Sequence, residues 1–155
     1  MMTCQNHASC VANAIDQADQ ICLRDGLRFT ELRRTVLKLI WASHGPTKAY
    51  DLLGKLQILD NSAKPATVYR TLSFLIENGL IHKVNSLNAF VGCSHPLKHN
   101  DCYFLICEDC SEIRECCDGD ISSMIVSTVK KNNFTLKTTT LEIAGRCNDC
   151  VQGTK

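Results

Sequence analysis

The sequence predicts an α+β fold made of two parts, an N-terminal helical part that ends in a β-hairpin and a smaller C-terminal α/β part. Three observations lead to this prediction. Apolar residues recur at helical spacing through residues 11–76, short β-prone runs follow them, and two Cys-x-x-Cys pairs lie further along the chain. A chain of 155 residues that is 45% hydrophobic is long enough for one ordinary domain or two small ones.

The first two helices are each bounded by recognisable start or stop signals. Apolar residues at helical spacing predict a helix over residues 8–25, and Gly26 is placed to stop it. Thr30 is the expected N-cap of a second helix, because a threonine side chain can accept a hydrogen bond from the unpaired N–H groups of a first turn. That helix is expected to end at the breaker His44-Gly45-Pro46.

Two more helices and a hairpin complete the N-terminal part. Thr47 is the expected cap of a short third helix, and Pro65 and Gly79 frame a fourth. The fourth helix is expected to turn one set of side chains inward, namely Val68, Leu72, Leu75 and Ile76, and another outward, namely Thr67, Tyr69, Arg70 and Ser73. Two β-prone runs, 80–84 and 90–92, follow. This order is typical of a winged helix-turn-helix, in which the last helix enters the major groove of DNA.

Residues 93–101 are expected to form a linker, and beyond it the pattern changes to that of a small α/β unit. The expected elements are strands over 103–107 and 113–116, a helix over 121–131 and a β-prone run over 134–143. The predicted domains are a winged-helix domain over 1–85, a wing end and hinge over 86–101, and an α/β domain over 102–152.

Composition narrows the class of protein. No apolar run reaches the length of a membrane span, and the start MMTCQNHASC lacks the basic flank and apolar stretch of a signal peptide. We therefore expect a cytoplasmic protein with no membrane partner. Eleven cysteines in such a compartment indicate thiols and metal ligands more than disulfides. Residues 1–85 hold ten Lys/Arg against seven Asp/Glu, and residues 86–155 hold seven against nine, which is compatible with DNA binding by the N-terminal part.

Two Cys-x-x-Cys pairs are expected to hold one structural zinc ion. The four ligands would be Cys107, Cys110, Cys147 and Cys150. Zinc prefers four tetrahedral ligands, and each pair can present two thiolates from one tight turn. A redox role for one pair would leave the other without a function, so zinc is the better interpretation. A shell of four cysteines has no open position, and the site is therefore structural and not catalytic.

A looser group of possible ligands lies around the hairpin and the strand after the first cysteine pair. It consists of His82, Cys93, His95, His99, Cys102 and Glu115. A site between two domains could set the angle between them, and a mixture of cysteine and histidine favours zinc over harder cations. Cys4, His7 and Cys10 could also meet a metal ion, with a frayed N-terminus as the alternative. Cys116 and Cys117 are interpreted as core residues, as neighbours of the ligands or as redox-sensitive thiols.

Four features then resemble one known family. They are Ala-Tyr-Asp-Leu-Leu at 49–53, Lys-Pro-Ala-Thr-Val-Tyr-Arg-Thr-Leu at 64–72, Gly-Leu-Ile-His-Lys-Val at 79–84, and the two cysteine pairs. Together they are similar to the ferric uptake regulator family of bacterial metal-sensing repressors, over residues 10–150. The zinc uptake regulator branch resembles this chain most, because His82 follows the predicted recognition helix and Cys93 ends the hairpin.

The resemblance implies roles for particular residues. It assigns a regulatory zinc ion to His82, Cys93, His99 and Glu115. His99 lies eight residues before Cys107, a spacing that leaves His95 and Cys102 as alternatives for the third ligand. The resemblance also implies DNA contacts by Tyr50, Lys64, Thr67, Tyr69 and Arg70, and it makes the C-terminal part a dimerisation domain.

The function implied by the resemblance is that of a zinc-responsive transcriptional repressor. It would bind two zinc ions per subunit, one structural and one regulatory, bind a pseudo-palindromic operator as a zinc-loaded homodimer, and control zinc-uptake genes. An iron- or peroxide-sensing member of the same family is the alternative. A zinc or thiol enzyme is a further alternative, but the chain has no His-Glu-x-x-His pattern, and we expect no catalysis.

Overall fold

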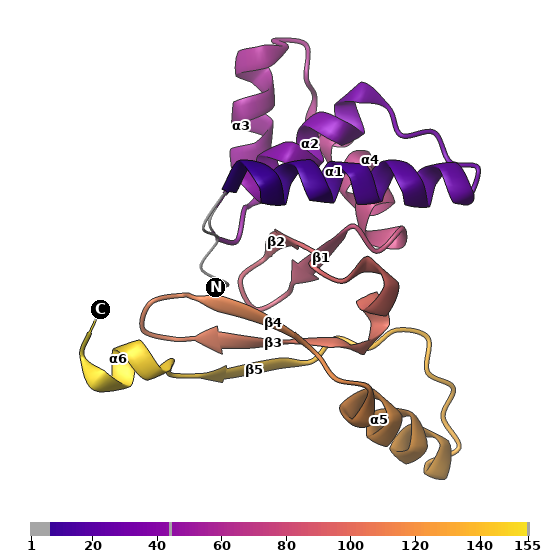
Figure 1. Cartoon of the computed structure of the whole chain (residues 1–155), viewed down its shortest axis with the longest axis vertical. Helices are drawn as coiled ribbons and strands as arrows, with labels where there is room; N and C mark the ends of the chain where they lie inside the picture. Colours follow the sequence, from indigo (N-terminus) through magenta and orange to yellow (C-terminus); the bar gives the residue numbers. More distant parts are fainter. Residues whose placement is uncertain (1–6, 44, 155) are drawn as a thin grey trace. The chain divides into compact units, whose positions relative to one another are not determined.

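The computed structural model describes residues 7–43 and 45–154 and divides into two compact units. The N-terminal unit extends to Ser94 and the C-terminal unit begins at His95. In the described residues the N-terminal unit combines helices with a two-stranded sheet, and the C-terminal unit contains a three-stranded sheet (Figure 1). The predicted α+β class is confirmed. The division between the units falls inside the segment 86–101 that we assigned to the wing end and hinge.

Four helices form the body of the N-terminal unit: α1 (His7–Arg24), α2 (Glu31–Ala42), α3 (Ala49–Leu59) and α4 (Pro65–Glu77). The expected signals act as predicted at four helix ends. Thr30 accepts a hydrogen bond from the Arg33 N–H, Pro65 occupies the first turn of α4, and Gly26 and Gly79 adopt the positive φ that stops α1 and α4. The core between these helices is aliphatic and includes Ala18, Val36, Ile40, Leu52, Val68, Leu72 and Leu75.

The hairpin pairs β1 (Ile81–Val84) with β2 (Ala89–Gly92) in antiparallel register. The prediction that Thr47 caps α3 is wrong. Lys48 occupies the cap position without a side-chain bond, and Thr47 instead exchanges two backbone hydrogen bonds of 2.9 Å with Phe90 of β2. This pairing makes Thr47 an added bridge on the hairpin, so the N-cap is Lys48 and α3 begins at Ala49, one residue later than predicted.

A close approach fixes the hairpin against α2. A Cβ atom at Gly92 would overlap the indole ring of Trp41, so this position of β2 requires a residue without a side chain. Trp41 lies in the last turn of α2 and packs at the margin of the core. The glycine therefore determines how closely the wing can lie to the helical body.

The C-terminal unit is built on a sheet of three strands in the order β4-β3-β5. The strands are β3 (Cys102–Cys107), β4 (Ile113–Cys117) and β5 (Glu142–Gly145), and the helical elements are the 3-10 helix η1 (Pro96–Asp101), α5 (Gly119–Lys131) and α6 (Asn148–Gln152). β4 pairs antiparallel to β3, whereas β5 pairs parallel to it. The parallel pairing requires the long connection through α5.

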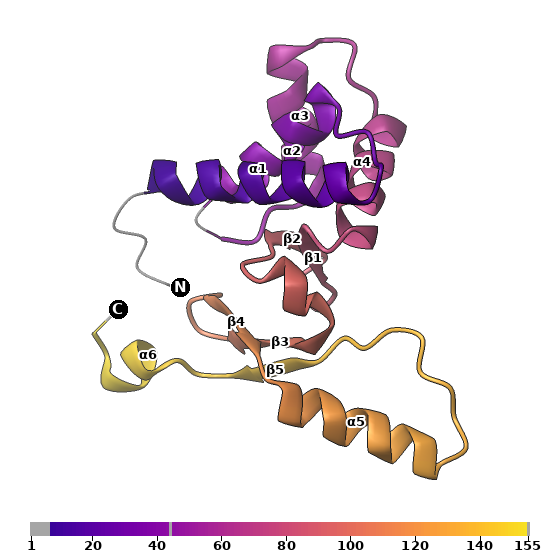
Figure 2. The ribbon, with the colours of Figure 1, turned by 45° about the vertical axis from the view of Figure 1, so that its right-hand side comes forward.

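Two expectations for this unit are wrong. The segment expected to be a linker over residues 93–101 contains η1, which starts at Pro96 because proline suits a first helical turn. The β-prone run over 134–143 forms a strand only from Glu142, since β5 pairs with only four residues of β3. Figure 2 shows the rest of the run as an open connection from α5 back to β5. β-prone residues adopt strand structure only where a partner strand is present.

The C-terminal unit leaves much apolar surface exposed. No residue of α5 is buried, and Met124 and Val126 of that helix are 69% and 37% exposed. Leu105 of β3 and Ile143 of β5 are partner residues on neighbouring strands, and both are also exposed. Across the described residues, none of the helices has the length and apolar character that crossing a membrane requires.

Candidate functional site

The two Cys-x-x-Cys pairs meet because β3 and β5 run parallel. Cys107 is the last residue of β3 and lies opposite Gly145 in the register, two residues before Cys147. Cys110 follows in a tight turn, in which Ser111 has φ +57° and donates its N–H to the Cys107 carbonyl. Cys150 lies in the short helix α6 that begins just after Cys147. Both pairs therefore lie at the C-terminal ends of neighbouring strands, at the same end of the sheet.

The four sulfur atoms form a compact cluster. All four lie within 4.8 Å of one another, and the sulfurs of Cys110 and Cys147 are 3.7 Å apart. In a tetrahedral zinc site with Zn–S bonds of about 2.3 Å, neighbouring sulfurs are about 3.7 Å apart. The donor set and its spacing therefore fit one zinc ion with a closed shell.

The local electrostatics favour a first thiolate and oppose further ones. The backbone N–H groups of Cys147 and Cys110 are directed at the Cys107 sulfur, and they lower the pKa of that thiol to about 6. The pKa of Cys150 is raised by its hydrogen bond with Cys147 and by burial. The pKa of Cys110 is also raised: the Glu112 N–H lowers it, but burial and the neighbouring Cys107 thiol outweigh that effect. A divalent cation would relieve this accumulation of negative charge.

An ion pair ties the two cysteine turns together outside the sulfur cluster. Arg146, next to Cys147, donates from Nε to the Asp109 carboxylate at 2.5 Å, and Asp109 precedes Cys110. The same guanidinium contacts the Cys150 carbonyl at 3.4 Å. Residues beside the ligands thus hold the two turns in place.

The residues expected to bind a regulatory zinc ion divide between the units. His82, in β1, and Cys93, just after β2, belong to the N-terminal unit, and both are buried. His99, in η1, and Glu115, in β4, belong to the C-terminal unit and are partly buried. The expected site at Cys4, His7 and Cys10 is not tested, because Cys4 and the side chain of His7 lie outside the described residues.

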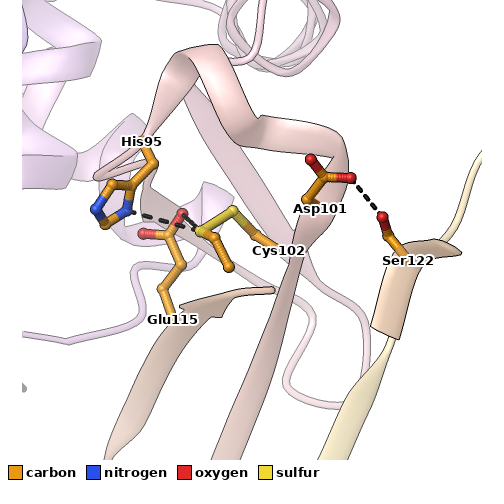
Figure 3. The surroundings of a disulfide bond; sticks show 6 residues. His95, Asp101, Cys102, Glu115 and Ser122 are labelled. Atoms are coloured by element: carbon orange, nitrogen blue, oxygen red, sulfur yellow. Dashed lines mark hydrogen bonds between the residues drawn. A yellow bond between two sulfur atoms is a disulfide. The ribbon is translucent and has the colours of Figure 1, made fainter. Parts of the chain in front are cut away.

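Cys102 and Cys117 form a disulfide, which differs from the general expectation of thiols and metal ligands but agrees with the interpretation of Cys117 as a redox-sensitive thiol. The reason is the register of the sheet, which places the two residues directly opposite each other on β3 and β4. His95 and Glu115 approach the same pair: the Cys117 sulfur is 3.7 Å from His95 Nδ1 and 3.9 Å from Glu115 Oε1. Figure 3 shows both side chains directed toward the sulfur atoms.

The candidate DNA-binding residues lie on an exposed surface of the N-terminal unit. In α4, Val68, Leu72 and Leu75 are buried in the core, while Tyr69, Arg70 and Ser73 point away from it, as the helical periodicity predicts. Thr67 is partly buried and Lys64 occupies the N-cap position. Tyr50, in the first turn of α3, is 82% exposed and lines one depression together with Tyr69, Lys48 and Lys83. An aromatic ring that exposed is not explained by packing in the core.

The ferric uptake regulator family model matches residues 24–144. This chain belongs to the ferric uptake regulator family. Among its relatives, the zinc uptake regulation protein of Escherichia coli (strain K12) is 37% identical over 139 residues, covering 88% of this chain and 80% of that protein. The zinc uptake regulation protein of Mycobacterium tuberculosis (strain H37Rv) is 27% identical over 129 residues, covering 81% of this chain and 95% of that protein.

Solved structures of the family agree with this assignment. A zinc uptake regulator complexed with zinc and DNA has a TM-score of 0.86 and 34% identity, covering 93% of this chain and 97% of that one. The crystal structure of holo XcZur has a TM-score of 0.82 and 38% identity, covering 89% and 96%. The predicted resemblance to the family and to its zinc uptake regulator branch is confirmed. Family members are regulators of transcription.

Two features of this family member are missing from the sequence-based expectations. The pairing of Cys102 with Cys117 depends on a strand register, and no spacing rule along the chain reveals it. The ion pair between Arg146 and Asp109 joins residues 37 positions apart. The only signal for it is that each residue adjoins a cysteine of a Cys-x-x-Cys pair.

Proposed function

We propose that this chain is a zinc-responsive transcriptional repressor that binds operator DNA as a zinc-loaded homodimer and controls zinc-uptake genes. The observation that supports this most is the TM-score of 0.86, at 34% identity, with a zinc uptake regulator complexed with zinc and DNA. The match covers 93% of this chain, so both units take part in it.

Binding to DNA is assigned to α4 and the start of α3. A recognition helix needs one face in the core and one face free for the major groove, and α4 has this division. Arg70 is exposed on the free face and can donate two hydrogen bonds to a guanine edge or bind a phosphate. Lys64, Thr67, Tyr69 and Tyr50 are proposed to contact the backbone or bases around it.

Two zinc ions per subunit are proposed, with different roles. The closed site of Cys107, Cys110, Cys147 and Cys150 would hold the end of the C-terminal unit together. The regulatory ion would bind His82, Cys93, His99 and Glu115, with His95 or Cys102 as alternatives to His99. Since these ligands come from both units, zinc would favour one arrangement of the units, the arrangement that binds DNA, and so shift a population.

A homodimer is proposed from the exposed apolar surface of the C-terminal unit. Met124 and Val126 of α5, and Leu105 and Ile143 of the sheet, are the side chains that a second copy would cover. Exposed apolar surface marks many protein interfaces, and most soluble homo-oligomers are two-fold symmetric. A two-fold dimer would present two α4 helices to successive major grooves, roughly 34 Å apart, which implies a pseudo-palindromic operator.

The test is DNA binding under buffered free metal. Fluorescence anisotropy of the purified chain with promoter fragments of zinc-uptake genes is measured across free zinc and, separately, free ferrous iron. We expect binding to switch on at free zinc concentrations far below those at which iron acts, with a footprint over an inverted repeat. Activation by iron alone would favour the iron-sensing alternative. DNA affinity that does not change with the concentration of either metal, or a footprint without an inverted repeat, would contradict the proposal.

A further inference from the structure

The C-terminal unit contains a second group of side chains of the kinds that can bind a metal ion, apart from the four cysteines of the closed site. His95 lies at the N-cap of η1, Cys102 begins β3, and Glu115 and Cys117 lie two residues apart on β4. Residues two apart on a strand point to the same face. Because Cys102 is directly opposite Cys117 in the register, all four side chains converge at one end of the β3–β4 pair (Figure 3).

Three members of this group already lie close to the spacing of a zinc shell, and Cys102 is linked to them through Cys117. The ligand atoms of His95, Glu115 and Cys117 lie within 4.8 Å of one another, and Cys117 is 3.7 Å from His95 and 3.9 Å from Glu115. Ligand atoms around tetrahedral zinc are separated by about 3.3–3.8 Å. In the disulfide state Cys102 and Cys117 cannot complete the shell, because a disulfide sulfur is no longer a thiolate and cannot serve as a zinc ligand.

We propose that His95, Cys102, Glu115 and Cys117 form a zinc site that exists only while both cysteines are reduced, and that formation of the Cys102–Cys117 disulfide releases the ion. The reduced group offers two thiolates, one imidazole and one carboxylate, a donor set that suits zinc. The disulfide is the alternative state of the same two sulfurs. Metal binding and disulfide formation are therefore mutually exclusive.

The oxidation needs an electron acceptor, and the proposed class is a hydroperoxide. The two thiolates lose two electrons and form one S–S bond. The O–O bond of the hydroperoxide accepts the electrons and takes up two protons, which yields an alcohol and water. Zinc leaves as the unchanged divalent ion. Little movement of the chain is required, because the sheet already holds Cys102 and Cys117 opposite each other.

The scaffold around the site is fastened independently of the sulfurs. Asp101, the last residue of η1, accepts a hydrogen bond of 2.5 Å from the Ser122 hydroxyl of α5 (Figure 3). Its backbone carbonyl accepts a second hydrogen bond from the Asp118 N–H. Reduction of the disulfide should therefore leave β3, β4 and η1 in place. The site also shares Glu115 with the proposed regulatory ligands, and the carboxylate has two oxygens with which to serve both.

Zinc counting by native mass spectrometry on the full-length chain tests the proposal without any DNA. Reduced wild-type protein is expected to hold one zinc ion more per subunit than reduced Cys117→Ser. After mild treatment with hydrogen peroxide the wild type should lose that ion, become two hydrogen atoms lighter, and match the variant in zinc content. Peptide mapping should place the new bond between Cys102 and Cys117.

Two further variants guard against misfolding and indirect effects. His95→Ala, at an exposed position, should lower the affinity for the additional zinc ion by more than about tenfold, measured in competition with a chelator. Disulfide formation in this variant should remain intact. Cys116→Ser is the matched control: it lies on the same strand with its side chain on the opposite face, and its zinc count should equal that of the wild type.

Equal zinc counts for reduced wild type and Cys117→Ser would overturn the proposal, and so would retention of the ion after the disulfide has formed. Zinc-dependent operator binding is measured separately on the same samples. Its failure alone would contradict the proposed function and leave the redox-dependent site standing.

Discussion

Asp19 and Arg34 form a bidentate ion pair that joins α1 to α2. Both terminal nitrogens of Arg34 donate to the two carboxylate oxygens of Asp19, at 2.6 and 2.7 Å. The hydrogen bond from Arg34 holds the pKa of Asp19 below its usual value. A carboxyl group whose pKa is lowered by folding stabilises the protein above its unfolded pKa of about 3.9 and loses that contribution as the pH falls through the folded pKa.

Asp19→Asn should therefore lower the free energy of unfolding at pH 7 by about 0.5–1 kcal/mol, a small value because the Asp19 side chain is 45% exposed. Urea unfolding, followed by the fluorescence of the only tryptophan, Trp41, measures the difference. The gap between wild type and variant should narrow as the pH is lowered from 7 to 3. Asp16→Asn, three residues earlier, serves as the control and should lower the free energy of unfolding by less. A gap of equal size at both pH values would disprove the assignment.

Arg70 is the residue whose removal should affect DNA binding most directly. Arg70→Ala is expected to weaken operator binding by about 1–3 kcal/mol with unchanged zinc content, because the guanidinium on the free face of α4 would lose its contact with a base or phosphate. Fluorescence anisotropy measures the operator affinity, and metal analysis of the same sample measures the zinc content. Lys137→Ala removes the same charge from the C-terminal unit and should leave affinity nearly unchanged. An Arg70→Ala protein with wild-type affinity would remove this residue from the interface.

At the scale of elements, the contact between β2 and α2 is the most sensitive to side-chain size. Gly92→Ala would drive a methyl group into the Trp41 ring, and such overpacking typically costs about 1–3 kcal/mol. Gly54→Ala is a matched control, because the added Cβ in α3 would meet no atom within 4 Å and alanine favours helix. Urea unfolding of both variants should thus give shifts of opposite sign. Equal stability of Gly92→Ala and wild type would show that the hairpin adjusts freely.

The elements also show where sequence reasoning succeeds and where it fails. α1, α2 and α4 were predictable because their spacing and their stop signals, such as Gly26 and Gly79, act within a few residues. The errors at Thr47 and over 134–143 share a different cause. Whether those residues join a sheet depends on Phe90 and on β3, which lie far away along the chain. The sulfur cluster was predictable because zinc requires a ligand spacing that is visible in the sequence.

At the scale of the whole molecule, the two proposed zinc sites should respond differently to loss of a ligand. Cys110→Ser leaves three thiolates in the closed site, so the C-terminal unit should lose the folding free energy that zinc supplies, and dimerisation should fail with it. His82→Ala should instead remain a folded dimer that retains its structural zinc but no longer increases its operator binding when zinc is added.

Circular dichroism, sedimentation and anisotropy on the two variants separate these outcomes. The assignment of His82 to a regulatory site would be wrong if His82→Ala still responded to zinc. It would also be wrong if that variant unfolded in the way expected of Cys110→Ser. A Cys110→Ser protein with normal stability and normal zinc content would refute the structural role of the four cysteines.

The parallel pairing of β3 with β5 also sets an order of events during synthesis of the chain. The β3–β4 hairpin involves neighbours in sequence and can form soon after residue 117 has left the ribosome. β5 must wait for α5 and the connection after it, and the closed cysteine site must wait for Cys150. Until then Cys107 and Cys110 hold at most half a zinc shell. The N-terminal unit can therefore fold first. Completion of folding in the C-terminal unit then depends on whether zinc is available when the last cysteine, Cys150, has been synthesised.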